Sequence, residues 1–215
     1  MGNQGRVMAN IFIHGLGQTS ASWERTIHGL EVSNDIYCPD LSTILGSGEI
    51  SYSQLYSGFS AYCGKIGEKV NLCGLSLGGV LALHYAVENP KKVNSLILIG
   101  TQYRMPKKLL AFQNKIFKLM PEKMFKEMGF GKEGVIALSQ SMMDMDFTSE
   151  LKNIRCPVLL LCGKKDRANR KAAVSMSKEL VNRKLVYIEN AGHEANTDNP
   201  ERLAELINGF WQFHA

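Results

Sequence analysis

The sequence predicts a protein of the α/β class, built around a mostly parallel sheet of about six strands. Short runs rich in Val, Ile and Leu alternate with helical patterns along nearly the whole chain. Several of these runs are apolar at every position, which indicates strands that are buried on both faces. Strands of this kind, separated by helices, form a parallel sheet covered by helices on both sides. At 215 residues the chain is long enough for one domain with a sizeable core.

The first half of the chain supplies four of the expected strands, at residues 7–13, 35–38, 70–73 and 93–99. A helix is expected over residues 20–30, between the first two strands. The next helix is marked by apolar residues at helical spacing: Leu55, Phe59, Tyr62 and Ile66. The helix after the third strand must stop before Pro90, because the residue preceding a proline resists helical geometry.

The second half adds strands at residues 158–162 and 185–188 and a closing helix. Asn199 is a suitable N-cap for this helix, and Pro200 suits its first position. Its apolar stripe consists of Leu203, Leu206, Ile207 and Phe210.

Residues 102–147 interrupt this alternation, because they contain short amphipathic helical patterns and no strand pattern. Seven of the ten methionines lie here, at 105, 120, 124, 128, 142, 143 and 145. Methionine adapts to irregular apolar surfaces, which suits a lid over a pocket; the alternative is that these residues are ordinary core. We therefore expect an α/β core formed by residues 1–101 and 148–215, with residues 102–147 inserted as a short helical cap.

Positive charge is concentrated in the same insertion. Eight basic and two acidic residues lie between positions 102 and 132, giving this segment +6 where the whole chain carries +5. Solvated helix faces explain such a cluster, and so does attraction of an anionic substrate or membrane surface. No aromatic-interleaved basic motif accompanies it, so a nucleic-acid partner is not expected.

Other features of the sequence limit where the protein resides. No apolar run is long enough to span a bilayer, and no secretory signal is visible, so we expect no stable membrane insertion. Five cysteines, at positions 38, 63, 73, 156 and 162, show no metal-like pairing and no plausible disulfide. Reduced thiols in a cytoplasmic protein are the simplest interpretation.

The strongest motif is Gly74-Leu75-Ser76-Leu77-Gly78, directly after a strand and directly before a helix. A serine on such a sharp turn is held in a strained conformation that lifts its hydroxyl clear of the sheet. The flanking positions must be glycine, because larger side chains would collide with the adjoining strand and helix. This pattern predicts that Ser76 is a nucleophile, with Gly74 and Gly78 as its elbow glycines.

A second motif, His14-Gly15-Leu16-Gly17, closes the first strand. Hydrolysis at a carbonyl group forms an oxyanion, which two backbone N–H groups can stabilise. We expect the amides of Leu16 and Leu77 to be these donors. His14 is expected to fix the loop by hydrogen bonding.

A nucleophilic serine needs a base, and the base needs an orienting carboxylate. His193 and Asp166 each follow a predicted strand, so they emerge at the same edge of a parallel sheet as Ser76. Asp144 and Asp146 are the alternative acids. The remaining histidines, His28, His84 and His214, lie on helices with no reason to be the base.

Four segments, HGLGQTSASW, GLSLGG, CPVLLLCGKKD and AGHEANTDNPE, together resemble the α/β-hydrolase superfamily, in particular its small, cap-bearing carboxylesterase-like branch. That branch includes the pimeloyl-ester carboxylesterases of biotin synthesis and the enol-lactone hydrolases. The resemblance implies a triad of Ser76, Asp166 and His193, oxyanion amides at Leu16 and Leu77, no metal and no organic cofactor. Family members usually carry an N-terminal β-hairpin, which is reduced or absent here, so the strand at 35–38 should lie close to an edge of the sheet.

Serine at the elbow argues against the haloalkane dehalogenase and epoxide hydrolase relatives, which carry aspartate there. We therefore expect a serine hydrolase that cleaves a small or medium carboxylic ester, a small molecule, through an acyl-enzyme. The alternatives are a thioesterase, a lactonase or a lipid-ester hydrolase of the same fold, and a non-catalytic ligand-binding protein that retains the triad.

Overall fold

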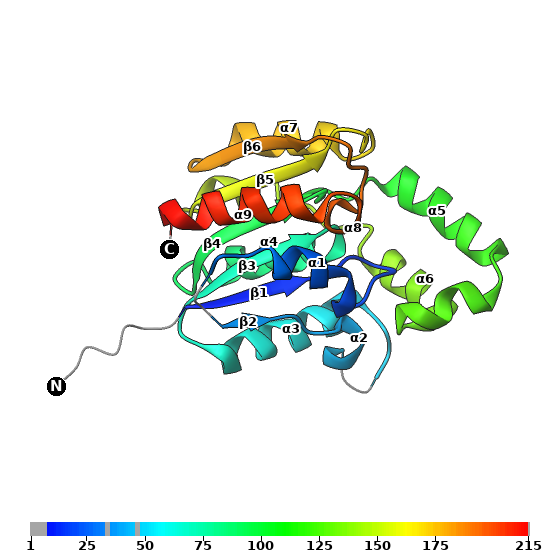
Figure 1. The fold of residues 1–215 in the computed structure, drawn as a ribbon. Helices are drawn as coiled ribbons and strands as arrows, with labels where there is room; N and C mark the ends of the chain where they lie inside the picture. The colour runs from blue at the N-terminus through cyan, green and yellow to red at the C-terminus, as the bar shows by residue number, and fades with distance from the viewer. Residues whose placement is uncertain (1–7, 33–34, 46–47, 215) are drawn as a thin grey trace.

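The computed structural model describes residues 8–32, 35–45 and 48–214 and contains a six-stranded, fully parallel sheet (Figure 1). The strand order is β2-β1-β3-β4-β5-β6. The strands are β1 (Ala9–Ile13), β2 (Ile36–Tyr37), β3 (Val70–Leu75), β4 (Val93–Ile99), β5 (Val158–Gly163) and β6 (Arg183–Ile188). This sheet confirms the predicted fold class and places the short strand β2 at an edge.

Helices connect the strands and cover both faces of the sheet. Those of the core are α1 (Glu24–His28), α2 (Leu41–Ile44), α3 (Tyr52–Ile66), α4 (Leu77–Glu88), α7 (Arg170–Glu179), α8 (Ala195–Asp198) and α9 (Pro200–His214). Short 3₁₀ turns occupy Ser20–Trp23 and Leu151–Asn153. Asn199 begins α9 as expected, because its side-chain oxygen accepts a hydrogen bond of 3.3 Å from the amide of Arg202.

Alternate residues of each strand pack into two separate hydrophobic cores. Ile11 and Ile13 of β1 point into the core formed with α2, α3, α4 and α7. Phe12, between them, points into the core formed with α1 and α9. There its ring lies 5.2 Å from the ring of Trp23 and 5.7 Å from that of Trp211. Burial on both faces explains why the central strands read as unbroken apolar runs.

Two details of the prediction are corrected by the structure. The helix expected over residues 20–30 is a 3₁₀ turn followed by α1, which ends at His28. Strand β6 begins two residues before the expected strand, at Arg183. Arg183 and Lys184 are exposed, which an edge strand tolerates and even favours, so their charge concealed the start of the strand.

The segment between β4 and β5 contains α5 (Lys107–Leu119), a 3₁₀ helix (Glu122–Met128) and α6 (Gly131–Ser141). Figure 1 shows α5 and α6 projecting beyond the carboxyl ends of the strands. An antiparallel bridge between Arg104 and Asp146 joins the two ends of this segment. Residues 102–147 are called the helical insertion below. Their role as a separate cap stays a prediction.

No described helix is both long and apolar enough to cross a bilayer. All five cysteines are free.

Candidate active site

Ser76 is the single residue that links β3 to α4, at the carboxyl edge of the sheet. Its backbone angles are φ 53° and ψ −114°, in a region that residues other than glycine rarely adopt. Two hydrogen bonds fix this conformation: the Ser76 amide donates to the carbonyl of Ile99 at 2.9 Å, and its carbonyl accepts from the Val80 amide at 3.0 Å. The turn thus has the strained strand-to-helix geometry that the motif predicts.

Glycine is required at three positions around this turn. A Cβ on Gly74 would lie 2.4 Å from the carbonyl oxygen of Gly78, and one on Gly78 would lie 2.2 Å from the carbonyl oxygen of Ile13. A Cβ on Gly79 would lie 1.9 Å from Oγ1 of Thr101. Because real Cβ atoms do not approach so closely, α4 can pack against β1, β3 and Thr101, which follows β4, only with glycine at these positions.

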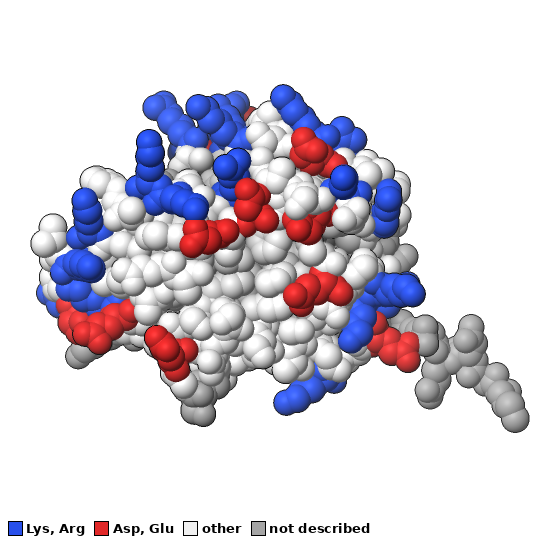
Figure 2. Space-filling view, turned by 180° about the vertical axis from the view of Figure 1, so that it is seen from behind, with Lys and Arg blue, Asp and Glu red and all other residues white. Residues whose placement is uncertain are grey.

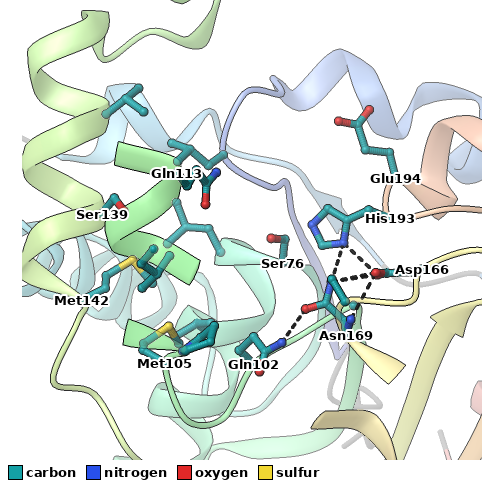
Figure 3. A pocket seen from close by; sticks show the side chains of 18 of the residues that line it. Ser76, Gln102, Met105, Gln113, Ser139, Met142, Asp166, Asn169, His193 and Glu194 are labelled. Carbon is teal, nitrogen blue, oxygen red and sulfur yellow. Dashed lines mark hydrogen bonds and ion pairs between the residues drawn. The ribbon is translucent and has the colours of Figure 1, made fainter. Parts of the chain in front are cut away.

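His193 and Asp166 lie on the loops after β6 and β5, and both line the same cavity as Ser76. Nδ1 of His193 lies 2.9 Å from Oδ2 of Asp166. Asp166 is buried, whereas the side chain of His193 is 41% exposed. In Figure 3 the imidazole lies between the carboxylate and Ser76. The structure therefore brings the three predicted side chains to one cavity, although no hydrogen bond joins Ser76 to the ring among the described residues.

Asn169, which the sequence analysis missed, holds the Asp166 carboxylate in place. Its side-chain nitrogen donates to both carboxylate oxygens, at 3.0 and 2.8 Å, and its backbone amide donates to Oδ1 at 3.2 Å. Gln102 in turn donates to the Asn169 side-chain oxygen at 2.7 Å, which fixes the orientation of that amide (Figure 3). The spacing Asp-x-x-Asn was the available signal, since an Asp side chain readily accepts from the backbone three residues later.

These donors also determine the charge of Asp166. Burial by itself would raise the pKa of this carboxyl group, but hydrogen bonds from His193 and Asn169 favour the ionised form more strongly, so its pKa is lowered. The Asn169 side-chain nitrogen also lies 3.0 Å from Nδ1 of His193. An ionised Asp166 favours the ring tautomer that carries its proton on Nδ1. The other ring nitrogen, Nε2, is then left free to accept a proton.

Gly100, which directly follows β4, lies against the side chains of His193 and Asp166. The sequence analysis did not identify it. Its φ of +54° is in the left-handed region. A Cβ there would lie 3.0 Å from Nδ1 of His193 and 3.2 Å from Oδ2 of Asp166. A side chain at this position would therefore press on the hydrogen bond between them.

Leu16 and Leu77 line the cavity as well. Among the described residues, neither backbone amide donates a hydrogen bond, and the amide of Leu77 is one of the free donors at the start of α4. His14 fixes the loop that carries Leu16. Its Nδ1 lies 2.8 Å from the carbonyl oxygen of Gly15, and its Nε2 accepts from the Leu41 amide at 3.0 Å.

The cavity has a volume of about 440 Å³ and lies between the carboxyl edge of the sheet and the helical insertion. Its walls are mainly apolar, with Leu16, Leu77, Val80, Met105, Leu110, Phe117, Val135 and Met142. No Lys or Arg of the described residues lines it. The positive charge of the insertion is thus carried outside the cavity.

The alternative residues lie elsewhere. Asp144 pairs with Lys107, and Asp146 pairs with Arg104, outside the cavity. His84 stacks on Tyr56, and His28 is exposed on α1; the side chain of His214 lies outside the described residues. No group of three or more His, Cys, Asp and Glu side chains in the described chain could hold a metal ion.

One buried histidine, His14, and one half-buried histidine, His84, predict how stability depends on pH. Burial lowers the pKa of His14 and of His84, although nearby acceptors and the carboxylates of Asp40 and Glu88 oppose the shift. Below pH 6.5 the unfolded chain then binds more protons than the folded chain, so stability is complete above that pH and falls as the pH decreases. We expect the free energy of unfolding to decrease between pH 7 and pH 5, by at most about 1.4 kcal/mol per pH unit for each histidine.

Urea unfolding at several pH values measures this effect. The His84→Gln variant should show a weaker pH dependence, and His28→Gln, at an exposed position, should match the wild type. A free energy of unfolding that stays constant from pH 7 to pH 5 would contradict the expectation.

The parallel sheet, the serine on its strained strand–helix turn and the histidine and aspartate at the same edge define the class of α/β hydrolases. A model of the alpha/beta hydrolase family matches residues 11–206. The chain belongs to this family.

Three relatives are distant in sequence, and each matches more than nine tenths of the chain. The pimeloyl-(acyl-carrier protein) methyl ester esterase of Aeromonas hydrophila is 23% identical, over 93% of this chain and 94% of that protein. Among solved structures, a thermophilic esterase from Thermogutta terrifontis superposes with a TM-score of 0.80 and 22% identity, over 98% of this chain and 92% of that one. NosK from Streptomyces actuosus gives a TM-score of 0.81 with 18% identity, over 97% of this chain and 99% of that one. These likenesses establish the fold.

Proposed function

We propose that this protein is a serine esterase that cleaves small or medium carboxylic esters, with Ser76 as nucleophile, His193 as base and Asp166 as the carboxylate that orients the base. One observation carries the proposal. Ser76 occupies a strained elbow in the same cavity as His193, and Nδ1 of that histidine lies 2.9 Å from the buried carboxylate of Asp166.

Acylation follows from this arrangement. With its Nδ1–H directed to Asp166, His193 accepts the Ser76 proton on Nε2 while Oγ attacks the ester carbonyl carbon. The resulting oxyanion accepts hydrogen bonds from the amides of Leu16 and Leu77, and the N-terminus of α4 favours its charge. The imidazolium then protonates the leaving alkoxide. The products of this half-reaction are an alcohol and an acyl group esterified to Ser76.

Deacylation repeats these steps with water. His193 takes a proton from the water molecule, whose oxygen attacks the acyl carbon, and it returns the proton to Ser76 as the carboxylic acid leaves. Asn169 acts as a positioning residue, because its side-chain nitrogen donates to the Asp166 carboxylate and lies 3.0 Å from Nδ1 of His193, the ring nitrogen that does not take the Ser76 proton.

The cavity supports an uncharged small or medium substrate, and the relatives support an ester bond as the target. Apolar walls and the lack of a lining cation among the described residues suit an uncharged chain. Two relatives are called esterases, the Aeromonas hydrophila and Thermogutta terrifontis proteins. We further propose that residues 102–147 act as a cap, since Met105 and Met142 of this insertion line the cavity above Ser76.

Turnover of short-chain nitrophenyl esters by the purified protein tests the proposal, together with stoichiometric labelling of Ser76 by a fluorophosphonate. We expect both. Labelling without turnover of any ester from two to eight carbons would favour a ligand-binding protein that retains the three residues.

A second candidate function, lipid-ester hydrolysis at an anionic surface, is favoured by the outer face of α5. Phe112 and Leu119 are 61% and 87% exposed, and Ile116 is exposed between them. Lys108 and Lys115 share this face at helical spacing and form no ion pair with a described side chain. Figure 2 shows further Lys and Arg at this end of the molecule, with some acidic side chains among them. Apolar and basic side chains mixed on one helix face suit an anionic lipid surface.

Sedimentation with lipid vesicles tests the surface binding that this second function requires. We expect binding to vesicles with anionic headgroups, weak binding to zwitterionic ones, and a decrease with rising salt. The double variant Lys108→Glu, Lys115→Glu should bind at least about tenfold more weakly. The Lys171→Glu variant on α7 is the matched control for charge reversal. Equal binding to both vesicle types would contradict this function.

A further inference from the structure

Besides Gln102, which binds Asn169, the insertion contributes two neutral polar side chains to the mainly apolar cavity. They are Gln113 of α5 and Ser139 of α6. Figure 3 shows both on the side of the cavity away from Asp166 and Asn169. Neither residue takes part in the chemistry proposed for Ser76.

Ser139 is an exception to ordinary helix chemistry. It is only 4% exposed, and its hydroxyl has no hydrogen-bond partner among the described residues. A helical serine usually returns its hydroxyl to a carbonyl of the preceding turn. Ser141, two residues later on α6, does so, since it donates to the Leu138 carbonyl at 2.8 Å. A buried hydroxyl without a partner is unfavourable, so its presence in a cavity wall suggests that a ligand satisfies it.

The side chains nearest in the lining determine what that ligand can be. Val135 and Met142 flank Ser139 on α6, and Leu110 and Phe117 flank Gln113 on α5. Gln113 forms no hydrogen bond with a described residue, so its amide is available both to donate and to accept. An anionic group here would be desolvated without a countercharge, because no described Lys or Arg lines the cavity. A cationic group would lie on the opposite side of the cavity from the lining acids, Asp166 and Glu194 (Figure 3). The ligand group must therefore be uncharged.

We propose that Ser139 and Gln113 form a subsite for a neutral hydrogen-bonding group, a hydroxyl or a carbonyl oxygen, carried on the substrate chain at a distance from the ester. A carbonyl oxygen can accept from either side chain, and a hydroxyl can donate to or accept from either one. This subsite deepens the proposed function, on which its catalytic consequence rests. With this subsite, the protein should prefer a substrate whose chain carries a hydroxyl or carbonyl oxygen over one with a plain alkyl chain of equal length.

Binding of uncharged, unreactive ligands tests the subsite independently of any turnover. The probes are straight-chain primary amides of four to eight carbons, each compared with the amide of equal length that carries a terminal hydroxyl, by isothermal titration calorimetry. For the wild type we expect the hydroxylated member to bind about tenfold more tightly at one chain length, because an unpaired buried group is then satisfied. That chain length gives the distance from Ser76 to the subsite.

Two variants attribute the preference to the two residues. Ser139→Ala should reduce it to less than about threefold and bind the plain amide at least as tightly as the wild type, since no hydroxyl is then left unpaired. Gln113→Met should also reduce it. Ser141→Ala, on the same helix but outside the cavity lining, should retain the wild-type preference. Equal binding of the paired amides at every length, undetectable binding of the hydroxylated members, or a full preference in Ser139→Ala would overturn the proposal.

Ser76→Ala separates this proposal from the proposed function. If both hold, that variant loses ester turnover and keeps the tenfold preference between the amides. If Ser76→Ala kept both its ester turnover and its preference between the amides, the proposed esterase mechanism would be rejected and the subsite would still be supported.

Discussion

Ser76→Ala is expected to lower kcat/KM for nitrophenyl esters by at least about 10⁴-fold, because no other described hydroxyl lies at the elbow where the acyl-enzyme would form. Removing the nucleophile from enzymes of this kind leaves only the contribution of binding and the oxyanion donors. Alanine keeps the Cβ that Ser76 already carries at φ 53°, so the backbone strain of the turn is the same in both proteins. The variant should therefore fold normally.

The measurement pairs steady-state kinetics with circular dichroism and thermal melting. Ser177→Ala is the control, since that serine lies on α7 and its hydroxyl donates to the Val174 carbonyl at 2.8 Å. It should retain nearly the full turnover. If Ser76→Ala still turned over more than about a tenth of the wild-type amount, the nucleophile would be a different residue.

The parts of the site that depend on local sequence were predictable. The strand–turn–helix context of Ser76 is contiguous in the chain. The loops of Asp166 and His193 each follow a strand whose last residues are mainly apolar, although charged residues conceal the start of β6. A parallel sheet then places all three at one edge by topology alone. Their use as a triad remains a proposal.

Gly100 and Asn169 could not be found in this way, because their roles arise from contacts between separate elements. Gly100 looks like an ordinary glycine at a strand end until β5 and β6 bring Asp166 and His193 over it. The amide of Asn169 is oriented by Gln102, the first residue of the helical insertion, which is far from Asn169 in sequence. Ser139 is a similar case. Only packing shows that its hydroxyl is buried and unpaired.

The side chains of the insertion that face the cavity were the hardest to predict, because their positions also depend on contacts between separate elements. Its helical patterns are amphipathic, but α5 has apolar residues on two faces: Leu110 and Phe117 line the cavity, while Phe112 and Leu119 are exposed. Of its methionines, Met105 and Met142 line the cavity, and Met124 is exposed. Composition alone therefore indicated a lid without showing which side chains face the substrate.

Gly78→Ala is expected to have the second largest effect, because the new methyl group would collide with backbone. The Cβ would lie 2.2 Å from the carbonyl oxygen of Ile13 and 2.7 Å from that of His14. Both atoms belong to the end of β1, which leads into the loop that carries the Leu16 amide, and Gly78 directly follows the Leu77 amide. To make room, α4 and the end of β1 must separate, which moves apart the two amides proposed to bind the oxyanion.

We expect this variant to lose about 1–3 kcal/mol of stability in urea unfolding and about 10²-fold in kcat/KM, since displacement of preorganised donors by about 1 Å is enough for a loss of that size. Gly64→Ala is the matched control. Gly64 lies in α3, a Cβ there would meet nothing within 4 Å, and alanine favours a helix over glycine, so this variant should be about 0.5–1 kcal/mol more stable with unchanged kinetics. If Gly78→Ala were as stable and as active as the wild type, the close approach of α4 to β1 would not be what positions the elbow. The requirement for glycine after the nucleophile would then need a different physical cause.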